Sequence, residues 1–353
     1  MAKTLMKGNE ALSEAAIRAG LKAFYGYPIT PQNEVPAYMA EHLPLRGGVY
    51  LQAESEVSAI NMVYGAAGAG ARVMTSSSSP GISLKQEGIS YIAAAQLPCV
   101  IVNVVRSGPG LGGIQPSQGD YFQAVKGGGH GDYRLIVLAP GSVQEMADLT
   151  TLGFDLADKW RNPVMILSDG ILGQMMEPVE FPEEAKVEEV EKPWATTGAV
   201  NRKPNVVNTL DIIADQAEKN LGRLLAKYER IKEEEVRWQE VSTDDADLIL
   251  VGYGTSARVA RSSMELARKE GLKVGLFRPI TLWPFPEQQL RALAKPGRAF
   301  IAVEMSAGQM IEDVRLAVNG VSPVYLSNRL GGMVPTPEDV LAKIRDILEG
   351  RAN

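Results

Sequence analysis

An almost uninterrupted apolar run, Cys99–Val105, limits the possible folds of this chain more than any other feature. A strand buried on both faces of a parallel sheet reads as such a run, whereas a half-buried strand alternates apolar and polar residues. Similar runs occur at 135–138 and 164–169. Segments with helical spacing of apolar residues precede the first run, at 84–94, and separate the last two, at 143–158. Alternating strands and helices predict a parallel, doubly wound α/β sheet.

The same alternation resumes after a stretch of different composition, so we expect three parts in the chain. Residues 1–185 are assigned to a first α/β domain. Prolines and acidic residues then open a connector, 186–243, which includes a long polar helix predicted over 207–240. A second α/β domain is assigned to 244–353, and its first strand to 247–251.

Composition excludes several classes of function. The chain has one cysteine, Cys99, and two histidines, His42 and His130, so it cannot by itself form a disulfide, an iron–sulfur cluster or a multi-histidine metal site. A formal net charge of -6 without a dense Lys/Arg tract argues against nucleic acid as a partner. No apolar stretch approaches the ~20 residues of a membrane helix, and the first residues lack a signal-peptide pattern. We therefore expect a cytoplasmic protein.

Polar and glycine-rich segments follow two predicted strands, at the sheet edge where open α/β folds bind ligands. Glu54 and Glu56 stand where the strand 49–52 passes into a helix. Arg106 ends the apolar run and precedes a glycine-rich loop, and Thr30 could join it in one crevice. Either glutamate could instead be an acid stabilised by the helix dipole. The sequence thus leaves both carboxylates open as site residues.

A rival interpretation comes from the second half. Gly252–Ala257 matches the dinucleotide fingerprint G-x-G-x-x-A, and Arg278 at the end of the next strand could select a phosphorylated ribose. An NADP-linked dehydrogenase is therefore one alternative, and a tight strand–helix turn is the other. Asp169 has no downstream asparagine cluster to complete a diphosphate–magnesium motif, so turn capping is favoured. His130 lies in a glycine-rich loop, and its role stays open.

Five segments carry a family signature: Gly-Tyr-Pro-Ile-Thr-Pro at 26–31, Gln-Ala-Glu-Ser-Glu at 52–56, Gly-Ala-Ala-Gly-Ala-Gly at 65–70, Met-Thr-Ser-Ser-Ser-Ser-Pro-Gly at 74–81 and Gly-His-Gly-Asp-Tyr at 129–133. With them, essentially the whole chain resembles the alpha subunit of 2-oxoacid:ferredoxin oxidoreductases, and most closely the branched-chain (2-oxoisovalerate) type. The resemblance implies a pyrimidine-binding domain of thiamine diphosphate enzymes, followed by a domain like the C-terminal domain of transketolase. Such a second domain would account for the glycine-containing turn at 252–257 without requiring that the chain bind a nicotinamide cofactor.

The resemblance also implies a reaction, the oxidative decarboxylation of a 2-oxoacid to acyl-coenzyme A and carbon dioxide, with electrons passed to ferredoxin. By resemblance, Glu56 hydrogen-bonds N1′ of the aminopyrimidine of thiamine diphosphate, and its spacing to Arg106 favours it over Glu54. Arg106 and Thr30 match the positions that bind the substrate carboxylate and carbonyl, and the planar fork of arginine suits a carboxylate. Further cofactor contacts are assigned to Tyr27, Pro28 and Ile29.

The same resemblance implies partner subunits. A beta subunit would hold the diphosphate and magnesium, and gamma and/or ferredoxin-like delta subunits would carry the iron–sulfur clusters. We expect 3-methyl-2-oxobutanoate as substrate, with 2-oxoglutarate as the alternative. A third hypothesis is a non-catalytic subunit that only completes the site of another chain.

Overall fold

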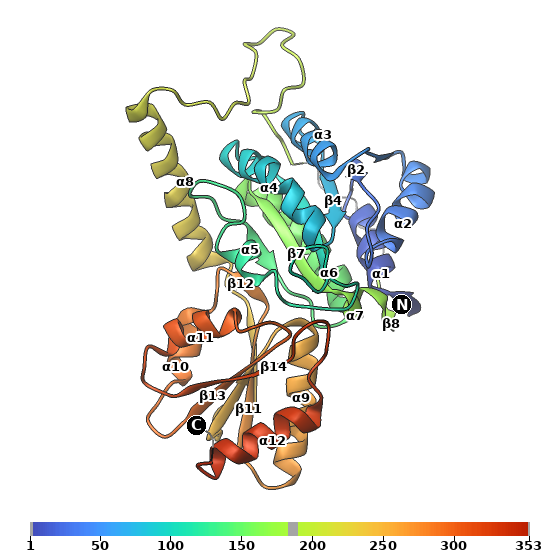
Figure 1. Ribbon diagram of the computed structural model, residues 1–353. Helices are drawn as coiled ribbons and strands as arrows, with labels where there is room; N and C mark the ends of the chain where they lie inside the picture. The colour runs from blue at the N-terminus through green and yellow to red at the C-terminus, as the bar shows by residue number, and fades with distance from the viewer. Residues whose placement is uncertain (1–2, 183–189, 352–353) are drawn as a thin grey trace.

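The computed structural model describes residues 3–182 and 190–351, and its strands form two main sheets and one separate pair. Figure 1 shows the two sheets one above the other, with α8 running alongside the upper unit. Within the described residues, no helix has the length and apolar character needed to cross a membrane.

The first sheet confirms the predicted parallel α/β architecture. Its strands, in chain order, are β2 (Ala23–Gly26), β3 (Val49–Gln52), β4 (Val73–Ser77), β5 (Cys99–Val105), β6 (Ile136–Leu138), β7 (Pro163–Asp169) and β12 (Thr281–Trp283). They lie in the order β12-β6-β7-β5-β4-β2-β3, and only the β12–β6 pair is antiparallel. Every residue of β5 is buried, as its apolar sequence predicts for a central strand.

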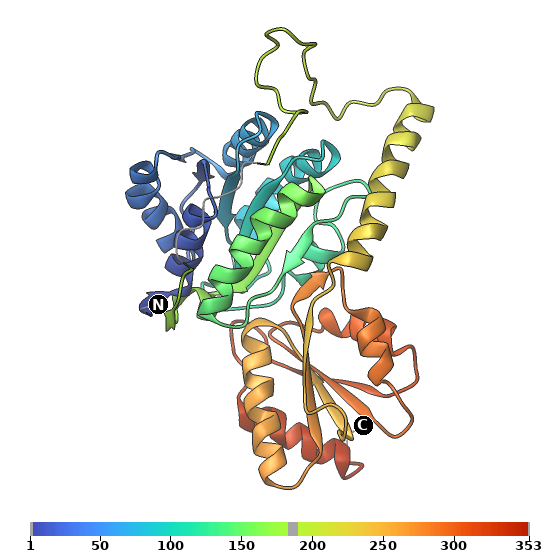
Figure 2. The ribbon, with the colours of Figure 1, turned by 180° about the vertical axis from the view of Figure 1, so that it is seen from behind.

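Helices cover both faces of this sheet. They are α1 (Gly8–Arg18), α2 (Glu34–His42), a 3₁₀ turn (Pro44–Arg46), α3 (Glu56–Gly68), α4 (Ser79–Ala94), α5 (Tyr121–Val125), α6 (Val143–Trp160) and α7 (Gly170–Gln174). Helices α3 and α4 pack together on one face and α1 and α6 on the other, as comparison of Figures 1 and 2 shows. The predicted polar loop at 76–81 is wrong, because α4 already begins at Ser79, with Pro80 in its first turn.

The second sheet is smaller and also mainly parallel. It contains β9 (Trp238–Val241), β10 (Leu248–Val251), β11 (Val274–Pro279), β13 (Ala299–Glu304) and β14 (Val324–Asn328), in the order β14-β13-β10-β11-β9. Its helices are α9 (Gly254–Lys269), α10 (Glu287–Leu293), α11 (Met310–Val318) and α12 (Pro337–Leu348). A separate antiparallel pair joins β1 (Thr4–Lys7) to β8 (Met176–Val179).

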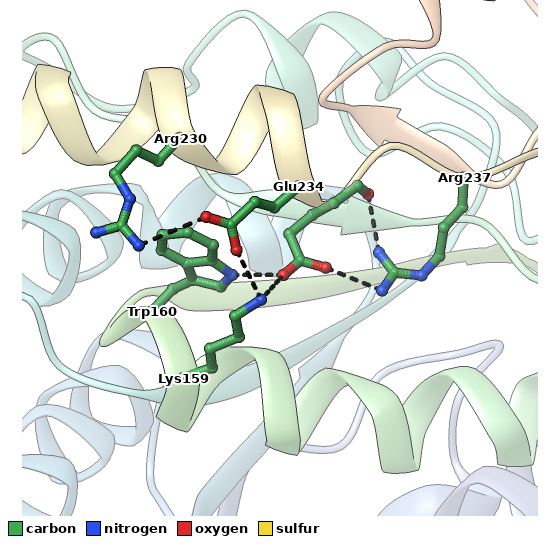
Figure 3. Close-up of polar contacts among 6 residues, drawn as sticks. Lys159, Trp160, Arg230, Glu234 and Arg237 are labelled. Carbon is green, nitrogen blue, oxygen red and sulfur yellow. Dashed lines mark hydrogen bonds and ion pairs between the residues drawn. The ribbon is translucent and has the colours of Figure 1, made fainter.

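The long polar helix α8 (Ala214–Glu234) is shorter than the predicted span 207–240, because the chain leaves the helix at Glu235. Glu235 is buried, and its carboxylate accepts hydrogen bonds from Lys159 (2.6 Å), Trp160 (2.8 Å) and Arg237 (2.9 Å). Figure 3 shows these three side chains converging beneath the end of α8. The cluster fixes the end of α8 to the end of α6, and the chain then continues into β9.

Two strands link the halves that the sequence separates. The strand β12, from the predicted second domain, completes the edge of the first sheet, and β9, from the predicted connector, pairs with β11 in the second sheet. The predicted boundary near residue 185 lies outside the described residues. The three-part division at 185 and 243 therefore stays a prediction.

Candidate functional site

The carboxyl ends of β2, β3, β4 and β5 meet at one edge of the first sheet, and Glu56 lies there as the first residue of α3. Ser55 precedes the helix and caps it, with its hydroxyl accepting from the Ser58 amide at 3.2 Å. Glu56 is only 6% exposed. Its carboxylate lies against the first turn of α4, since a Cβ atom on Gly81 would sit 2.7 Å from Glu56 Oε1. A glycine is therefore needed at this contact.

Arg106 follows β5 and is brought to the loop that carries Thr30. Its Nη1 donates to the Thr30 carbonyl and its Nη2 to the Leu111 carbonyl, both at 3.0 Å. The side chain is buried, and its Nε has no hydrogen-bond partner in the structure. The predicted pair of Thr30 and Arg106 is thus adjacent, and the guanidinium keeps one unpaired donor.

The loop after β2 contains the predicted cofactor contacts. Tyr27 and Ile29 are half-buried, while Pro28 is exposed. The buried side chain of Gln32 holds the loop, since its amide donates to the Tyr27 carbonyl at 3.5 Å and its oxygen accepts from the Ser76 hydroxyl. This loop therefore has a fixed position beside the end of β4.

Three buried polar atoms at the ends of β4 and β5 lack a hydrogen-bond partner among the described residues. The hydroxyls of Ser77 and Ser78 and the Nε of Arg106 are buried without a partner in the structure. A Cβ atom on Gly81, which would lie 2.7 Å from Glu56 Oε1, would lie 2.1 Å from Ser77 Oγ. Since the great majority of buried polar atoms in proteins are hydrogen-bonded, a group of unpaired ones fits a polar ligand. These atoms leave hydrogen-bonding capacity at the end of the sheet where Glu56 lies.

The two glutamates differ in environment. Glu54 is exposed, and its carboxylate accepts from the Ser58 hydroxyl, a hydrogen bond that lowers the pKa of Glu54. Of the two acids, Glu56 is the buried one, and its role as the site residue stays a prediction.

The sequence interpretation missed Lys85. This lysine of α4 is 0% exposed, and its Nζ donates to Thr75 Oγ1 at 2.7 Å and to the Ser76 carbonyl at 3.0 Å. Burial lowers the pKa of Lys85 to about 7, and the Glu56 carboxylate acts in the opposite direction. No signal in the sequence marked Lys85, because the contact of Gly81 with Glu56, four residues before it on α4, is visible only in the structure.

The geometry disfavours the dinucleotide interpretation. At the start of α9, Thr255 Oγ1 donates to Asp169 at 2.9 Å and Ser256 Oγ donates to Gln118 at 2.7 Å. These side chains of the first unit cover the helix end where a dinucleotide would place its diphosphate. Arg278, which could have selected a phosphorylated ribose, forms a fork with Glu145 at 2.7 and 2.8 Å. Asp169 also accepts from the Ile171 amide at 2.9 Å, which confirms turn capping.

His130 is exposed and contacts α4. Its carbonyl accepts from Ser90 Oγ at 2.7 Å, and its ring meets Tyr91 edge-on at 6.0 Å between centroids. Among the described residues, no group of three or more His, Cys, Asp and Glu side chains is arranged to hold a metal ion.

A cavity of about 880 Å³ opens beside the loop that follows Arg106. Residues from both units line it, among them Ser79, Ser107, Asp120, Ser306 and Gln309. The cavity lies across the start of α4 and between the two halves of the chain, where a second ligand could reach the site.

Comparison with known proteins gives two family matches. Residues 14–233 match the model for pyruvate flavodoxin/ferredoxin oxidoreductase, thiamine diphosphate-binding, and residues 246–340 match pyruvate:ferredoxin oxidoreductase core domain II. The chain is 55% identical to ketoisovalerate oxidoreductase subunit VorB of Methanothermobacter thermautotrophicus, with 98% of each chain covered. It is 37% identical to 2-oxoglutarate synthase subunit KorA of Methanothermobacter marburgensis, over 96% of this chain and 97% of that one.

Among solved structures, a 2-oxoglutarate:ferredoxin oxidoreductase from Magnetococcus marinus is similar to this chain, with a TM-score of 0.87 and 29% identity. The match covers 98% of this chain and 65% of that one. Both halves of the chain are therefore found together in a related protein.

Proposed function

This chain belongs to the pyruvate flavodoxin/ferredoxin oxidoreductase family, and from that premise we propose that it is the subunit providing the aminopyrimidine cleft of a branched-chain 2-oxoacid:ferredoxin oxidoreductase. The observation that carries the proposal is the buried Glu56 at the edge of the sheet where Arg106 meets Thr30, with the unpaired hydroxyl of Ser77 beside the same glycine, Gly81. The proposed reaction converts a 2-oxoacid and coenzyme A into acyl-coenzyme A and carbon dioxide and reduces ferredoxin.

Each side chain has one proposed task. Thiamine diphosphate, when bound, supplies a nucleophilic carbon for the ketone and an electron sink for the loss of carbon dioxide. Glu56 would hold a proton at N1′ of the aminopyrimidine, and its hydrogen bond would be strengthened because Glu56 is buried. Arg106 binds the substrate carboxylate through its free donor, and Thr30 orients the substrate carbonyl. Tyr27, Pro28 and Ile29 contact the ring.

Relatedness supports the branched-chain substrate over the alternative. The identity to the ketoisovalerate subunit, 55%, exceeds the 37% to the 2-oxoglutarate subunit. A 2-oxoglutarate enzyme must also bind a second carboxylate, and discrimination of this kind depends on one or two polar groups in the pocket.

The remaining parts of the enzyme are assigned to partners. With Cys99 as its one cysteine, buried in the core, this chain lacks the thiolates that an iron–sulfur cluster needs. We therefore assign the clusters to gamma and/or ferredoxin-like delta subunits, and the diphosphate and magnesium to a beta subunit. Coenzyme A is assigned to the cavity beside Ser107, because that cavity adjoins the loop after Arg106.

A purified complex tests the proposal directly. We expect ferredoxin reduction with coenzyme A and 3-methyl-2-oxobutanoate, and a much lower kcat/KM with 2-oxoglutarate. A preference for 2-oxoglutarate would overturn the substrate assignment. Reduction of NADP⁺ without ferredoxin would overturn the reaction itself.

Substitution of the two glutamates tests the mechanism. Glu56→Gln removes the carboxylate that holds the N1′ proton, so we expect a loss on the order of 10²–10⁴-fold in rate. Glu54→Gln is the matched control, because Glu54 is exposed on the preceding loop, and it should keep the parent rate. Full activity of Glu56→Gln in the complex would favour the non-catalytic assembly role instead.

A further inference from the structure

The cavity beside Ser107 has a wall of unusual composition. Among the described residues that line it, Asp120 is the one ionisable side chain, and the others are serines, glutamines, glycines, prolines and a few apolar residues. This wall contains no lysine, arginine or histidine. Sites for phosphate groups are formed by cations and by free backbone amides at helix N-termini. The cavity therefore suits an uncharged chain with amide groups better than a diphosphate.

The start of α4, which lines the same cavity, does not supply free amides either. The Ser79 amide donates to Asn103 Oδ1 at 3.2 Å, and Pro80 has no N–H group. The Gly81 amide donates to the Ser78 carbonyl at 2.7 Å. Of the parts of coenzyme A, the uncharged pantetheine arm with its terminal thiol therefore fits this wall best.

Asp120 occupies a helix cap without capping the helix. It is the N-cap residue of α5, where an aspartate ordinarily accepts a hydrogen bond from an amide of the first turn. Its side chain forms no such bond, and the Phe122 amide donates instead to Gln309 Oε1 of the second unit at 2.8 Å. The Asp120 carboxylate accepts from Asn103 Nδ2 at 2.9 Å and lines the cavity. The carboxylate is thus available for another task.

Hydrogen bonds connect Asp120 with the substrate side of the site. Asn103 is 1% exposed, and the bond from the Ser79 amide to its Oδ1 fixes its orientation, so that Nδ2 faces Asp120. The Ser79 hydroxyl donates to the Arg106 carbonyl at 3.1 Å. A thiol beside Asp120 is therefore close to the residue assigned to the substrate carboxylate.

The other ionisable side chains on the neighbouring elements have partners elsewhere or are neutral. They are Arg106, Tyr121, Tyr253, Glu304 and Asp313. Arg106 donates to two backbone carbonyls, and Glu304 accepts from backbone amides of α11. Tyr121 donates to Asp313 at 2.6 Å, and Lys126 pairs with the same carboxylate. Burial raises the pKa of Tyr253 well above its usual range, so its hydroxyl stays neutral.

Asp120 forms no ion pair within the part of the chain that the structure describes. Burial raises the pKa of its carboxyl, and hydrogen bonds from Asn103 and Ser79 act in the opposite direction. A carboxylate whose pKa is raised accepts a proton more readily than an ordinary surface aspartate.

We propose that this cavity takes the pantetheine arm of coenzyme A and that Asp120 is the catalytic base that accepts the proton of its thiol. The inference rests on the proposed function, because it concerns the same reaction. The sulfur–hydrogen bond breaks, and its proton passes to the Asp120 carboxylate and then to solvent. The sulfur forms the thioester bond to the acyl carbon, which separates from the cofactor and leaves it the bonding electron pair. The preceding two-electron oxidation is the one that reduces ferredoxin.

The pKa of an ordinary thiol, about 8.5, sets the size of the effect. At about pH 6.5 only about 1% of the thiol is ionised without a base, so a variant that lacks the base should form thioester roughly 100-fold more slowly. At about pH 8.5 solvent ionises about half of the thiol, and the deficit should shrink to a few-fold. A merely structural role of Asp120 would not produce this change with pH.

The test uses the assembled complex with Asp120→Asn, which keeps an oxygen for Asn103 Nδ2 and is favoured at an N-cap. Thioester formation with coenzyme A and with pantetheine is measured by rapid quench at both pH values. Carbon dioxide release without coenzyme A, and coenzyme A affinity by calorimetry, do not require thiol ionisation. Asp148→Asn is the matched control: Asp148 lies on α6 outside the cavity wall, accepts from Gln144 Nε2 at 2.9 Å, and has a pKa raised by burial.

We expect Asp120→Asn to form thioester roughly 100-fold more slowly at about pH 6.5 and a few-fold more slowly at about pH 8.5, by the same factors with coenzyme A and pantetheine. Carbon dioxide release and coenzyme A affinity should stay within about twofold of the parent, and Asp148→Asn should match the parent throughout. If Asp120→Asn does not assemble, Asp120→Ser, also favoured at an N-cap and unable to take the proton, should show the same deficits.

Three results would contradict the inference. A deficit of equal size at both pH values would make Asp120 a structural residue. A deficit with coenzyme A but not with pantetheine would place Asp120 at the nucleotide. A parent complex that cannot transfer the acyl group to pantetheine would overturn the assignment of the arm.

The inference and the proposed function fail in different ways. A parent complex that forms no thioester from any 2-oxoacid overturns the proposed function. A parent complex that forms it, together with an Asp120→Asn variant of equal rate, overturns only the inference about Asp120.

Discussion

Replacing Gly81 by alanine tests whether the Glu56 carboxylate lies against the first turn of α4. The added Cβ would stand 2.7 Å from Glu56 Oε1 and 2.1 Å from Ser77 Oγ. Ordinary contacts to a Cβ begin at about 3.4 Å, so each of these two groups must move by roughly 1 Å. The serine hydroxyl can rotate away, whereas the glutamate is held at the start of α3.

The expected size of the effect follows from this displacement. A misplacement of about 1 Å in a catalytic group costs on the order of 10²-fold in rate. We expect Gly81→Ala to lower kcat/KM by that factor and to weaken thiamine diphosphate binding, measured by steady-state ferredoxin reduction and by calorimetry on the complex. Gly222→Ala is the control, because a Cβ on Gly222 meets nothing within 4 Å on α8. Parent affinity and rate in Gly81→Ala would refute the assigned position of Glu56.

Two further substitutions test the anchor of α8 and the substrate fork. Burial raises the pKa of Glu235, but hydrogen bonds from Lys159, Trp160 and Arg237 outweigh it and lower the pKa overall. The ionised carboxylate therefore stabilises the fold fully above the unfolded-state pKa of about 4.3. This contribution is lost as the pH falls through the lower, folded-state pKa. Glu235→Gln should reduce the free energy of unfolding by about 2–4 kcal/mol at neutral pH, discounted for the half-exposed Lys159, and by less in acid, as measured by urea titration. An equal loss at both pH values would contradict this account. Arg106→Lys should raise KM for the 2-oxoacid roughly tenfold without changing cofactor affinity, because the single ammonium cannot donate to both backbone carbonyls and also offer the donor that Nε provides; an unchanged KM would remove Arg106 from the substrate site.

Much of the first sheet was predictable because its strands are buried on both faces. The strand β5 reads as one apolar run, and β7 as another, so their positions follow from the sequence. The strand β14, by contrast, is only half-buried throughout and ends in Ser327 and Asn328, which gives no apolar run to detect. The end of α8 was missed because Glu235 looks like one more charged residue of a polar helix, while its partners come from the distant α6.

The site was predictable only in part. The resemblance led to Glu56, Arg106 and Thr30, and the structure brings the latter two into contact. Glu54 and Glu56 have similar neighbours in the sequence, but Glu54 is exposed and Glu56 is buried. The fold sets this difference, so the sequence alone could not choose between the two acids. Lys85 could not be distinguished from an ordinary surface lysine, because a helix with many small residues does not reveal which of its faces is covered by a sheet.

The pairing of β12 with β6 has a consequence for the order in which the chain can fold. The strand β6 (Ile136–Leu138) is made early, but the strand that covers its outer edge comes from residues 281–283, most of the way along the chain. On the ribosome, the first unit must therefore wait with a bare strand edge, which is a template for pairing with other chains. Until the second half has emerged, this edge of β6 therefore stays open to pairing with other chains.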